Sequence, residues 1–241
     1  MGKLIAIEGT DYSFKETQSR MLHEYILNNI SKNCQLISYP NYESDSSFMI
    51  RQMLSGVYGD KPTDIDPAVA SVFYMIDRFH DYLTNWKNMF KLEDSYIVAD
   101  RYSGSNIIHQ STKYNNQKSC IKMAKWLLDM EHVRFGLPVP TITIFISVPP
   151  EMVFELKKKE RLNNLKGGID KDIHEIDETY LISCHAKSLE LCNLLGWKIV
   201  SGVGVNGLKT KEEIHNDILD ILKGENYFEK TDINHTKRGD K

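Results

Sequence analysis

The chain of 241 residues contains only four cysteines, and they lie far apart. None of them forms a C-x-x-C pair, which disfavours a structural zinc site or a disulfide framework and favours reduced, buried thiols. The four positions are Cys34, Cys120, Cys184 and Cys192. The chain also lacks an apolar run of the roughly 20 residues that a membrane-spanning helix needs, so we expect no membrane partner. We recognise no internal repeat.

Neither sign of charge dominates the sequence, because 30 Lys and Arg residues face 33 Asp and Glu residues, for a net charge of −3. This balance disfavours bulk binding to nucleic acid, although it leaves room for a local basic pocket. No signal-peptide pattern precedes the first apolar stretch. With 41% hydrophobic and 26% charged residues, the composition is typical of a soluble globular protein, and we expect a cytoplasmic location.

Strand-like apolar segments alternate with helical segments along the chain. This alternation predicts a parallel sheet that is covered by helices on both faces. The predicted strands are residues 3–9, 35–39, 95–99, 141–148 and 197–200, and the main predicted helices are residues 15–30, 46–54, 68–90, 119–134, 151–160, 173–195 and 211–223. We see no linker within residues 1–223 and predict one domain. Residues 224–241 are polar and have little to bury, which predicts a disordered tail.

The first predicted strand ends at Gly9, and the first helix begins near Lys15. The spacing is that of a phosphate-binding loop, G-x-x-x-x-G-K-[S/T], in which backbone N–H groups surround the phosphates of a nucleotide. Two positions depart from the pattern, since Phe14 replaces the second glycine and Glu16 replaces the Ser or Thr. A strand, a loop and a helix with one lysine are common in α/β proteins, so this motif alone leaves both interpretations open.

Two further segments carry candidate binding residues. Residues 72–79 surround Arg78 with apolar and aromatic side chains, which fits either a core helix with an ion-paired arginine or a shelf for a flat base. Asp100 and Arg101 follow the third strand, where open α/β sheets bind ligands, and there we favour function over a simple salt bridge. A basic run at residues 157–161 precedes two glycines, and it fits either a solvated loop or a mobile lid.

Taken in order, these stretches resemble the thymidylate kinases, which are P-loop nucleoside monophosphate kinases. The likeness covers about residues 3–223, and among subgroups it is nearest to Clostridium-like bacterial members. Residues 172–175 of this chain resemble the end of the lid in that family. Residues 73–79 resemble the segment that flanks the thymine base. The stretches that carry the resemblance are Glu8-Gly9-Thr10-Asp11 with Lys15 and Thr17-Gln18, then Tyr39-Pro40, then Asp100-Arg101-Tyr102 with Ser105 and Gln110, and finally residues 144–151.

The resemblance implies a P-loop NTPase fold with three α/β/α layers, a five-stranded parallel sheet and a small lid at about residues 157–175. It implies transfer of the γ-phosphoryl group of ATP to dTMP, with Mg²⁺ as cofactor, and such transfer depends mainly on positioning and charge neutralisation. It further implies a homodimer that packs long helices together, small-molecule nucleotide partners and no nucleic-acid partner.

The resemblance also implies catalytic roles. Lys15 would hold the donor phosphates, Arg101 the acceptor phosphate, and Asp100 the magnesium shell through water. Arg161, or a lid lysine, would close over the transferring group. The loop that would bind ATP consists of Gly9, Thr10, Asp11, Tyr12, Ser13, Phe14, Lys15, Glu16 and Thr17.

For the acceptor, the family pattern implies that Asp11 reaches the 3′-hydroxyl of the sugar and Tyr74 stacks on thymine. Arg78 would donate to a base carbonyl, and Tyr102 would crowd the 2′ side of the sugar. The remaining implied contacts come from Ser105 and Asn106 at the base edge and from Tyr42, near a position where the family often has an arginine for the acceptor phosphate.

Tyr12 and Phe14 leave alternatives open. A bulky residue at position 14 should either displace the donor or force another loop path, because glycine there allows close approach of the backbone to phosphate. The chain is therefore either an active dTMP kinase or a catalytically impaired nucleotide-binding homologue. A third hypothesis is a kinase for another nucleoside monophosphate on the same fold.

Overall fold

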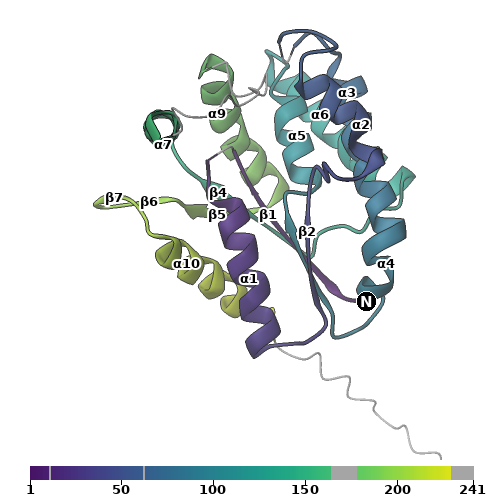
Figure 1. The fold of residues 1–241 in the computed structure, drawn as a ribbon, viewed down its shortest axis with the longest axis vertical. Helices are drawn as coiled ribbons and strands as arrows, with labels where there is room; N and C mark the ends of the chain where they lie inside the picture. The colour runs from purple at the N-terminus through teal and green to yellow at the C-terminus, as the bar shows by residue number, and fades with distance from the viewer. Residues whose placement is uncertain (11, 62, 164–177, 229–241) are drawn as a thin grey trace, which may run out of the picture.

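The computed structural model describes residues 1–10, 12–61, 63–163 and 178–228, with the side chains of residues 157–181 excepted. Five parallel strands form the main sheet in the order β2-β3-β1-β4-β5, which confirms the predicted five-stranded parallel sheet. Figure 1 shows this sheet at the centre of the molecule. The strands are β1 (Lys3–Gly9), β2 (Cys34–Ser38), β3 (Tyr96–Asp100), β4 (Ile142–Ser147) and β5 (Lys198–Ser201).

Helices cover both faces of the sheet, as the alternation of elements predicts. On one face, α1 (Lys15–Asn29) and α10 (Lys211–Gly224) pack together and against the strands. The opposite face carries α4 (Lys87–Phe90), α5 (Ser103–Ser111) and α9 (Glu178–Leu195), which contact β3, β1 and β4 respectively. The remaining helices are α2 (Phe48–Leu54), α3 (Pro67–Asp81), α6 (Gln117–Leu128) and α7 (Pro150–Asn163).

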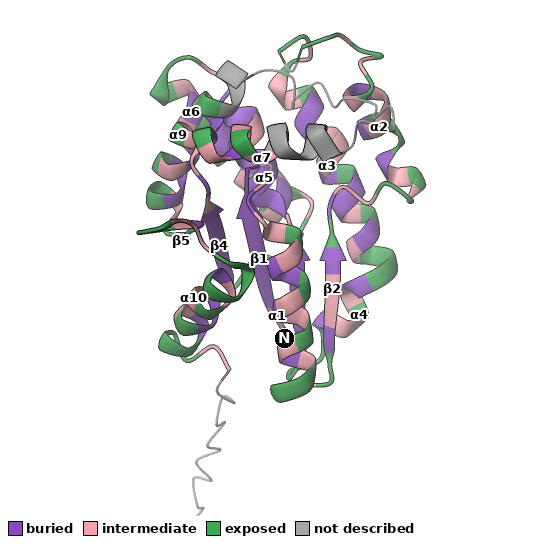
Figure 2. Cartoon of the chain, turned by 60° about the vertical axis from the view of Figure 1, so that its left-hand side comes forward, coloured by how far each residue is buried: buried purple, intermediate pink, exposed green. Residues whose placement is uncertain are grey.

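The central strand β1 is buried on both sides, which explains its continuous apolar sequence. Ile5 and Ile7 belong to the core cluster beneath α1 and α10. Leu4 and Ala6 face the other side, in a cluster with Trp86 and other aromatic side chains. Figure 2 shows that β1 and β4 are buried along most of their length, whereas the surrounding helices also expose residues. Strand β3 is buried at every position.

Several elements differ from the expectations. The predicted helix at residues 68–90 is continuous, but a π-helical segment at Tyr82–Trp86 separates α3 from α4. A second π-helical segment, Asp129–Arg134, extends α6. The helix α5 was not predicted, because its Ser, Gly, Asn and His residues are poor helix formers and packing decides its structure. The short 3₁₀ turn at Asp45–Ser47 and the small hairpin of β6 (Val203–Gly204) and β7 (Gly207–Leu208) were also missed.

The chain continues to pack on the core beyond α10. Tyr227 and Phe228, which the sequence assigns to the polar tail, lie against the cluster beneath α1 and α10. The Lys3 ammonium donates a hydrogen bond to the Tyr227 carbonyl oxygen, which joins this segment to β1. The predicted boundary at residue 224 is therefore moved to at least Phe228, and residues 229–241 lie outside the described residues. Within the described chain, no helix combines the length and apolarity needed to cross a bilayer.

Candidate nucleotide cleft

The loop between β1 and α1 has the backbone geometry that its glycine pattern requires. A Cβ on Gly9 would lie 2.2 Å from the Ser13 Oγ and 2.9 Å from the Ile146 carbonyl oxygen, so only glycine fits. Tyr12 and Phe14 have φ angles of 60° and 64°, in the left-handed region that glycine adopts easily. The Phe14 ring packs against the core cluster beneath α1. Phe14 therefore keeps the glycine-like backbone while its side chain contributes to the core.

Lys15 begins α1, and its Nζ donates a 3.0 Å hydrogen bond to the Thr10 carbonyl oxygen. A cavity of about 380 Å³ opens over this loop, and Leu156 of α7 forms its opposite wall. The loop residues that line it are Tyr12, Ser13, Phe14, Lys15, Glu16 and Thr17. Glu16 pairs with Arg20, one turn along α1, at 3.0 Å. Of the remaining predicted loop residues, Gly9 ends β1, Thr10 is buried, and Asp11 lies outside the described residues.

Asp100 and Arg101 lie at the end of β3, next to the same loop. The Arg101 Nη1 donates to the Ser105 Oγ at 3.1 Å and lies 3.4 Å from the Gly9 carbonyl oxygen. Asp100 is buried; its Oδ2 accepts a hydrogen bond from Ser38 at 3.1 Å, and its Oδ1 has no partner in the described chain. Burial raises the pKa of Asp100, and the positive charges of Lys15 and Arg101 partly oppose this rise.

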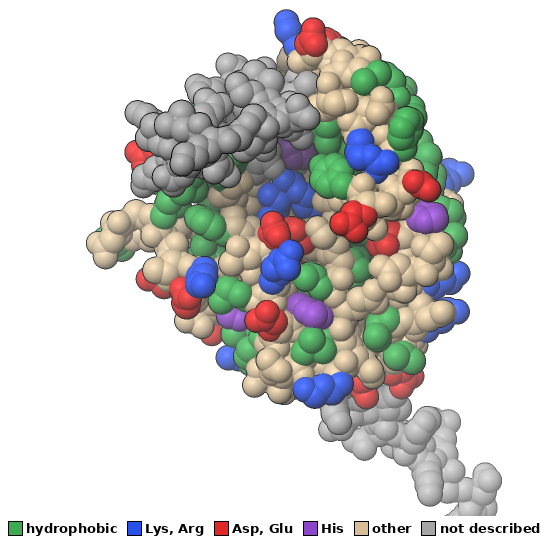
Figure 3. Space-filling view, in the orientation of Figure 1, with side chains coloured by type: hydrophobic (Ala, Val, Ile, Leu, Met, Phe, Trp, Pro, Cys, Tyr) green, Lys and Arg blue, Asp and Glu red, His purple; other side chains and the backbone are tan. Residues whose placement is uncertain are grey.

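Lys15 and Arg101, the two predicted phosphate-binding cations, thus both lower the pKa of Asp100, although they come from different parts of the sequence. Figure 3 shows Lys or Arg and Asp or Glu side chains meeting in a hollow near the centre of this face. Parallel strands bring these residues together, because β1 and β3 are neighbours and their carboxyl ends meet at one edge. The structure therefore places Lys15, Asp100 and Arg101 close enough for the two cations to act on the carboxylate.

Glu8, the residue before Gly9 in β1, also belongs to this site, although its position in an apolar strand gives no sign of that role. Its side chain is fully buried, and it accepts hydrogen bonds from the Tyr102 N–H at 2.8 Å and from the Ser105 hydroxyl at 2.6 Å. Arg101 has a φ of 62°, which is a strained conformation for a residue with a side chain. The hydrogen bonds of Glu8 to Tyr102 and Ser105 hold the turn that contains it. A Cβ on Gly104 would lie 2.6 Å from the Glu8 Oε1, which explains the glycine there.

A second network joins the residues predicted to read the base. The Arg78 Nε and Nη2 donate to Glu131 at 2.7 and 2.5 Å, and the Asn106 Nδ2 donates to the same carboxylate at 3.0 Å. All three side chains are at most 3% exposed. The interpretation of residues 72–79 as part of a core helix with an ion-paired arginine is confirmed, although the partner of Arg78 is the buried Glu131 of the π-helical segment after α6 and not a carboxylate at the surface. The sequence offered no signal for Glu131, which is distant from Arg78 along the chain.

Other residues that are predicted to bind the acceptor nucleotide are less closely grouped. Tyr102 is 0% exposed, lies in the aromatic cluster with Tyr39 and Trp86, and donates its hydroxyl to the Pro138 carbonyl oxygen at 3.1 Å. The structure does not bring this ring to the cleft, which corrects the expected contact with the sugar. The Ser105 hydroxyl donates to Glu8 and accepts from Arg101, so its hydrogen bonds are made within the protein.

Tyr42 is 51% exposed, in the loop after β2, and its carbonyl oxygen accepts a 2.7 Å hydrogen bond from Arg51. Tyr74 is half-buried on α3. The side chain of Arg161 lies outside the described residues, as does most of the predicted lid. The roles of these three residues stay predictions.

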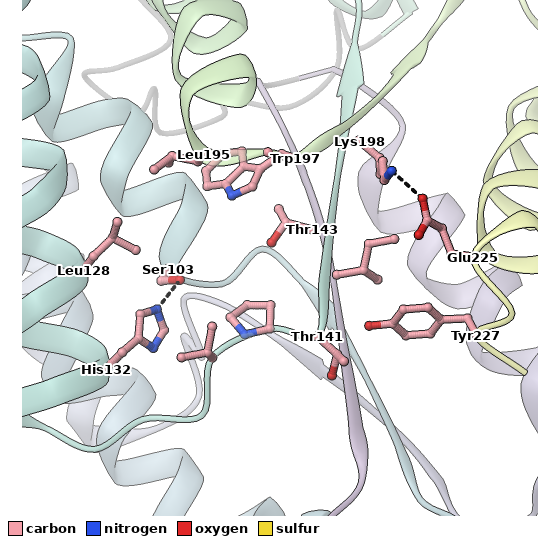
Figure 4. A pocket seen from close by; sticks show the side chains of 14 residues that line it. Ser103, Leu128, His132, Thr141, Thr143, Leu195, Trp197, Lys198, Glu225 and Tyr227 are labelled. Atoms are coloured by element: carbon pink, nitrogen blue, oxygen red, sulfur yellow. Dashed lines mark hydrogen bonds and ion pairs between the residues drawn. The ribbon is translucent and has the colours of Figure 1, made fainter. Parts of the chain in front are cut away.

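A second cavity, of about 320 Å³, lies at the other end of β4 (Figure 4). Its walls include Thr141 and Thr143 near the start of the strand, together with His132 and Trp197. The nucleotide cleft lies instead at the carboxyl ends of the strands, so this cavity is not part of it. Among the described residues, we find no cluster of three or more His, Cys, Asp or Glu side chains that could hold a metal ion.

A family model, Thymidylate kinase, matches residues 7–218 of the chain. The chain belongs to the thymidylate kinase family. The match spans the loop between β1 and α1, the Asp100-Arg101 turn and both layers of helices, and it confirms the family resemblance seen in the sequence.

Individual relatives of this thymidylate kinase family member are distant but similar over nearly their whole length. A thymidylate kinase of Plasmodium falciparum is 23% identical over 218 residues, covering 90% of this chain and 88% of the relative. One from Thermoanaerobacter sp. is 24% identical over 224 residues, covering 92% and 98%. These similar identities to a parasite and a bacterial enzyme leave the Clostridium-like subgroup a prediction.

Solved structures confirm the fold. The thymidylate kinase of Candida albicans superposes with a TM-score of 0.65 at 20% identity, covering 95% of this chain and 94% of that chain. The enzyme of Ehrlichia chaffeensis gives a TM-score of 0.60 at 16% identity, covering 92% and 98%. At these identities the structural likeness supports the α/β/α architecture, and the family model supports the family assignment.

Proposed function

We propose that this protein transfers the γ-phosphoryl group of ATP to dTMP, which gives dTDP. The observation that carries the proposal is the convergence of Lys15 and Arg101 on Asp100 at the carboxyl ends of β1 and β3. Two cations at one point suit a reaction in which phosphate oxygens of a donor and an acceptor must approach each other. Phosphoryl transfer needs little covalent chemistry from the protein beyond this positioning and charge neutralisation.

ATP binds with its terminal phosphates on the loop that connects β1 and α1. Backbone N–H groups and the N-terminus of α1 favour negative charge there, and Lys15 neutralises the β- and γ-phosphates. The glycine-like backbone of Phe14 supports an active loop more than the impaired homologue considered above. Arg161 of α7 or a lysine of the lid segment closes over the transferring group.

Mg²⁺ accompanies ATP. Asp100 fits a role in its hydration shell, because its Oδ1 is buried without a partner and carboxylate oxygens suit this ion. Asp100 would hold the hydrated ion, and the ion would supply charge neutralisation for the phosphates of ATP.

The acceptor dTMP lies on the opposite side of the cleft. Arg101 binds its phosphate, Asp11 its 3′-hydroxyl, and Tyr42 lies at the phosphate end. Tyr74 stacks on the base, and the network of Arg78 and Asn106 recognises its edge. The Tyr102 ring lies in the core and the Ser105 hydroxyl is bonded to Glu8, so neither is a direct ligand of dTMP in this proposal. Both residues act instead by holding Arg101.

Two molecules of the protein form the functional dimer in the cytoplasm. Val69, Ile76 and Leu83 recur every seven residues along α3 and the π-helical segment that follows it, and each is 44–50% exposed. Such a stripe of exposed apolar residues on one face of a long helix suits packing against a second copy.

A coupled assay of ADP release tests the proposal. Wild-type enzyme with ATP and Mg²⁺ should turn over dTMP faster than dCMP, dAMP or dGMP. Arg101→Ala should lower kcat/KM for dTMP by about 100-fold or more, because it removes a charge that the acceptor phosphate requires. The exposed Arg20→Ala on α1 is the matched control and should retain activity. Absence of turnover of every monophosphate by the wild type would refute the proposal.

A further inference from the structure

Glu131 binds two of the side chains that the proposed function assigns to base recognition. Its Oε1 accepts from both the Arg78 Nη2, at 2.5 Å, and the Asn106 Nδ2, at 3.0 Å, while its Oε2 accepts from the Arg78 Nε. The carboxylate is 0% exposed and lies in the π-helical segment Asp129–Arg134. Helix α3, helix α5 and this segment therefore meet at one buried charge.

A buried ion pair of this kind does not by itself argue for stability, because desolvating two charges costs about as much as their attraction returns. Its geometric effect is clearer. The Asn106 Nδ2 has two acceptors, Glu131 and the Ser71 carbonyl oxygen at 3.2 Å, and neither of these groups can donate. The amide of Asn106 is therefore held in one orientation.

This orientation leaves the Asn106 Oδ1 buried without any hydrogen-bond partner in the described chain. Buried acceptors in native proteins nearly always find a donor, from the protein, water or a ligand. A ligand that contacts the Asn106 Oδ1 therefore meets a hydrogen-bond acceptor, and an N–H or O–H group on the ligand satisfies it. If the amide turned over, the same position would present N–H groups and would demand an acceptor.

We propose that Glu131 is a specificity-determining positioning residue, which fixes the Asn106 amide and the Arg78 guanidinium so that they select a base with a ring N–H beside a carbonyl. The inference rests on the proposed function. Thymine presents a ring N–H next to a carbonyl oxygen, whereas cytosine presents an unprotonated ring nitrogen next to an amino group. Glu131 acts on base recognition only through Asn106 and Arg78. Its ion pair uses the Nε and Nη2 of Arg78 and does not include the Nη1.

The test is the ratio of kcat/KM for dTMP to that for dCMP, measured at saturating ATP. Glu131→Gln offers one acceptor and one donor group to three donors, so at least one of the hydrogen bonds from Arg78 and Asn106 is lost and a donor faces the amide N–H group. We expect the ratio to fall by about 10-fold or more, through a higher KM for dTMP, while KM for ATP stays unchanged. Asp129→Asn removes an exposed carboxylate, paired with Arg134 at 3.1 Å, from the same segment and is the matched control.

Glu131→Asp provides a second variant in case the first folds poorly. It keeps the charge but shortens the side chain by one methylene, so the ratio should fall by a smaller factor, with folding monitored by thermal unfolding. If a folded Glu131 variant kept the wild-type ratio, Glu131 would be structural only and the inference would fail. If wild-type enzyme phosphorylated no monophosphate, the proposed function itself would fail, and the two failures are thereby distinguished.

Discussion

Single residues in the cleft have environments that cannot be predicted from their neighbours in the sequence. Glu8 is the clearest case, since it stands in an apolar strand and yet accepts hydrogen bonds from the turn that contains Arg101. Burial raises the pKa of Glu8, and the hydrogen bonds from Ser105 and Tyr102 and the charge of Arg101 oppose this only in part. Glu8 is thus a buried acid whose ionised form is disfavoured by burial and only partly stabilised by its neighbours.

The raised pKa of Glu8 has a consequence for stability. A carboxyl group with a higher pKa in the folded state contributes stability below its ordinary pKa of 4.5, and this is lost as the pH rises through the folded value. Glu8→Gln cannot ionise and escapes this loss. We therefore expect the unfolding free energy of Glu8→Gln, relative to wild type, to increase as the pH rises above 4.5, the ordinary pKa of the carboxyl group.

Urea denaturation of both proteins at several pH values measures this difference. Asp129→Asn is a suitable control, because it removes an exposed carboxylate that pairs with Arg134 and has no contact with Glu8. A difference between Glu8→Gln and wild type that did not change with pH would contradict the expected ionisation of Glu8.

Phe14 is the second residue whose environment matters. Its φ of 64° costs about 1 kcal/mol or more for a residue with a Cβ. Packing of the ring against the core partly offsets this cost. Because the loop path is already that of glycine, Phe14→Gly should leave KM for ATP within about twofold of wild type. Steady-state kinetics with varied ATP measure this, and a fall in KM of tenfold would show instead that the ring obstructs the donor.

At the scale of elements, the segment after α10 behaves as part of the fold. Tyr227 and Phe228 pack on the core, the Lys3 ammonium lies 5.5 Å from the centre of the Tyr227 ring, and Glu225 pairs with Lys198 on β5. These contacts connect the C-terminal segment to the first and last strands of the sheet.

We expect a chain that ends at Gly224 to be less stable than one that ends at Phe228, by about 2 kcal/mol. The estimate reflects two partly buried aromatic side chains, each of which contributes about 1 kcal/mol when half of its burial is counted. Thermal or urea unfolding of the two chains measures the difference. Equal stability of the two chains would mean that residues 225–228 only rest on the surface.

At the scale of the whole molecule, the exposed stripe on α3 determines the expected assembly. Ile76→Lys with Leu83→Lys places two charges on that stripe and should convert a dimer to a monomer, as measured by sedimentation velocity. Val205→Lys, at the fully exposed tip between β6 and β7, is the control and should leave the dimer intact. A wild-type protein that sediments as a monomer at micromolar concentration would contradict the proposed dimer.

The sequence by itself determined the α/β class, the parallel sheet and the positions of Lys15, Asp100 and Arg101. These features are local, because strand and helix periodicity, together with the position of polar residues at strand ends, can be read from neighbouring residues. The family resemblance added the candidate substrate and the order of the motifs.

Only the tertiary structure decided which side chains meet. Glu131 binds Arg78 and Asn106, Glu8 holds the Arg101 turn, and Tyr102 turns into the core. Helix α5 likewise forms because it packs on α3, α6 and α9, against the weak propensity of its residues. The physical reason is the same in each case: burial and hydrogen bonding between distant segments outweigh local preferences, and a buried donor or acceptor takes whichever partner the packing brings within reach.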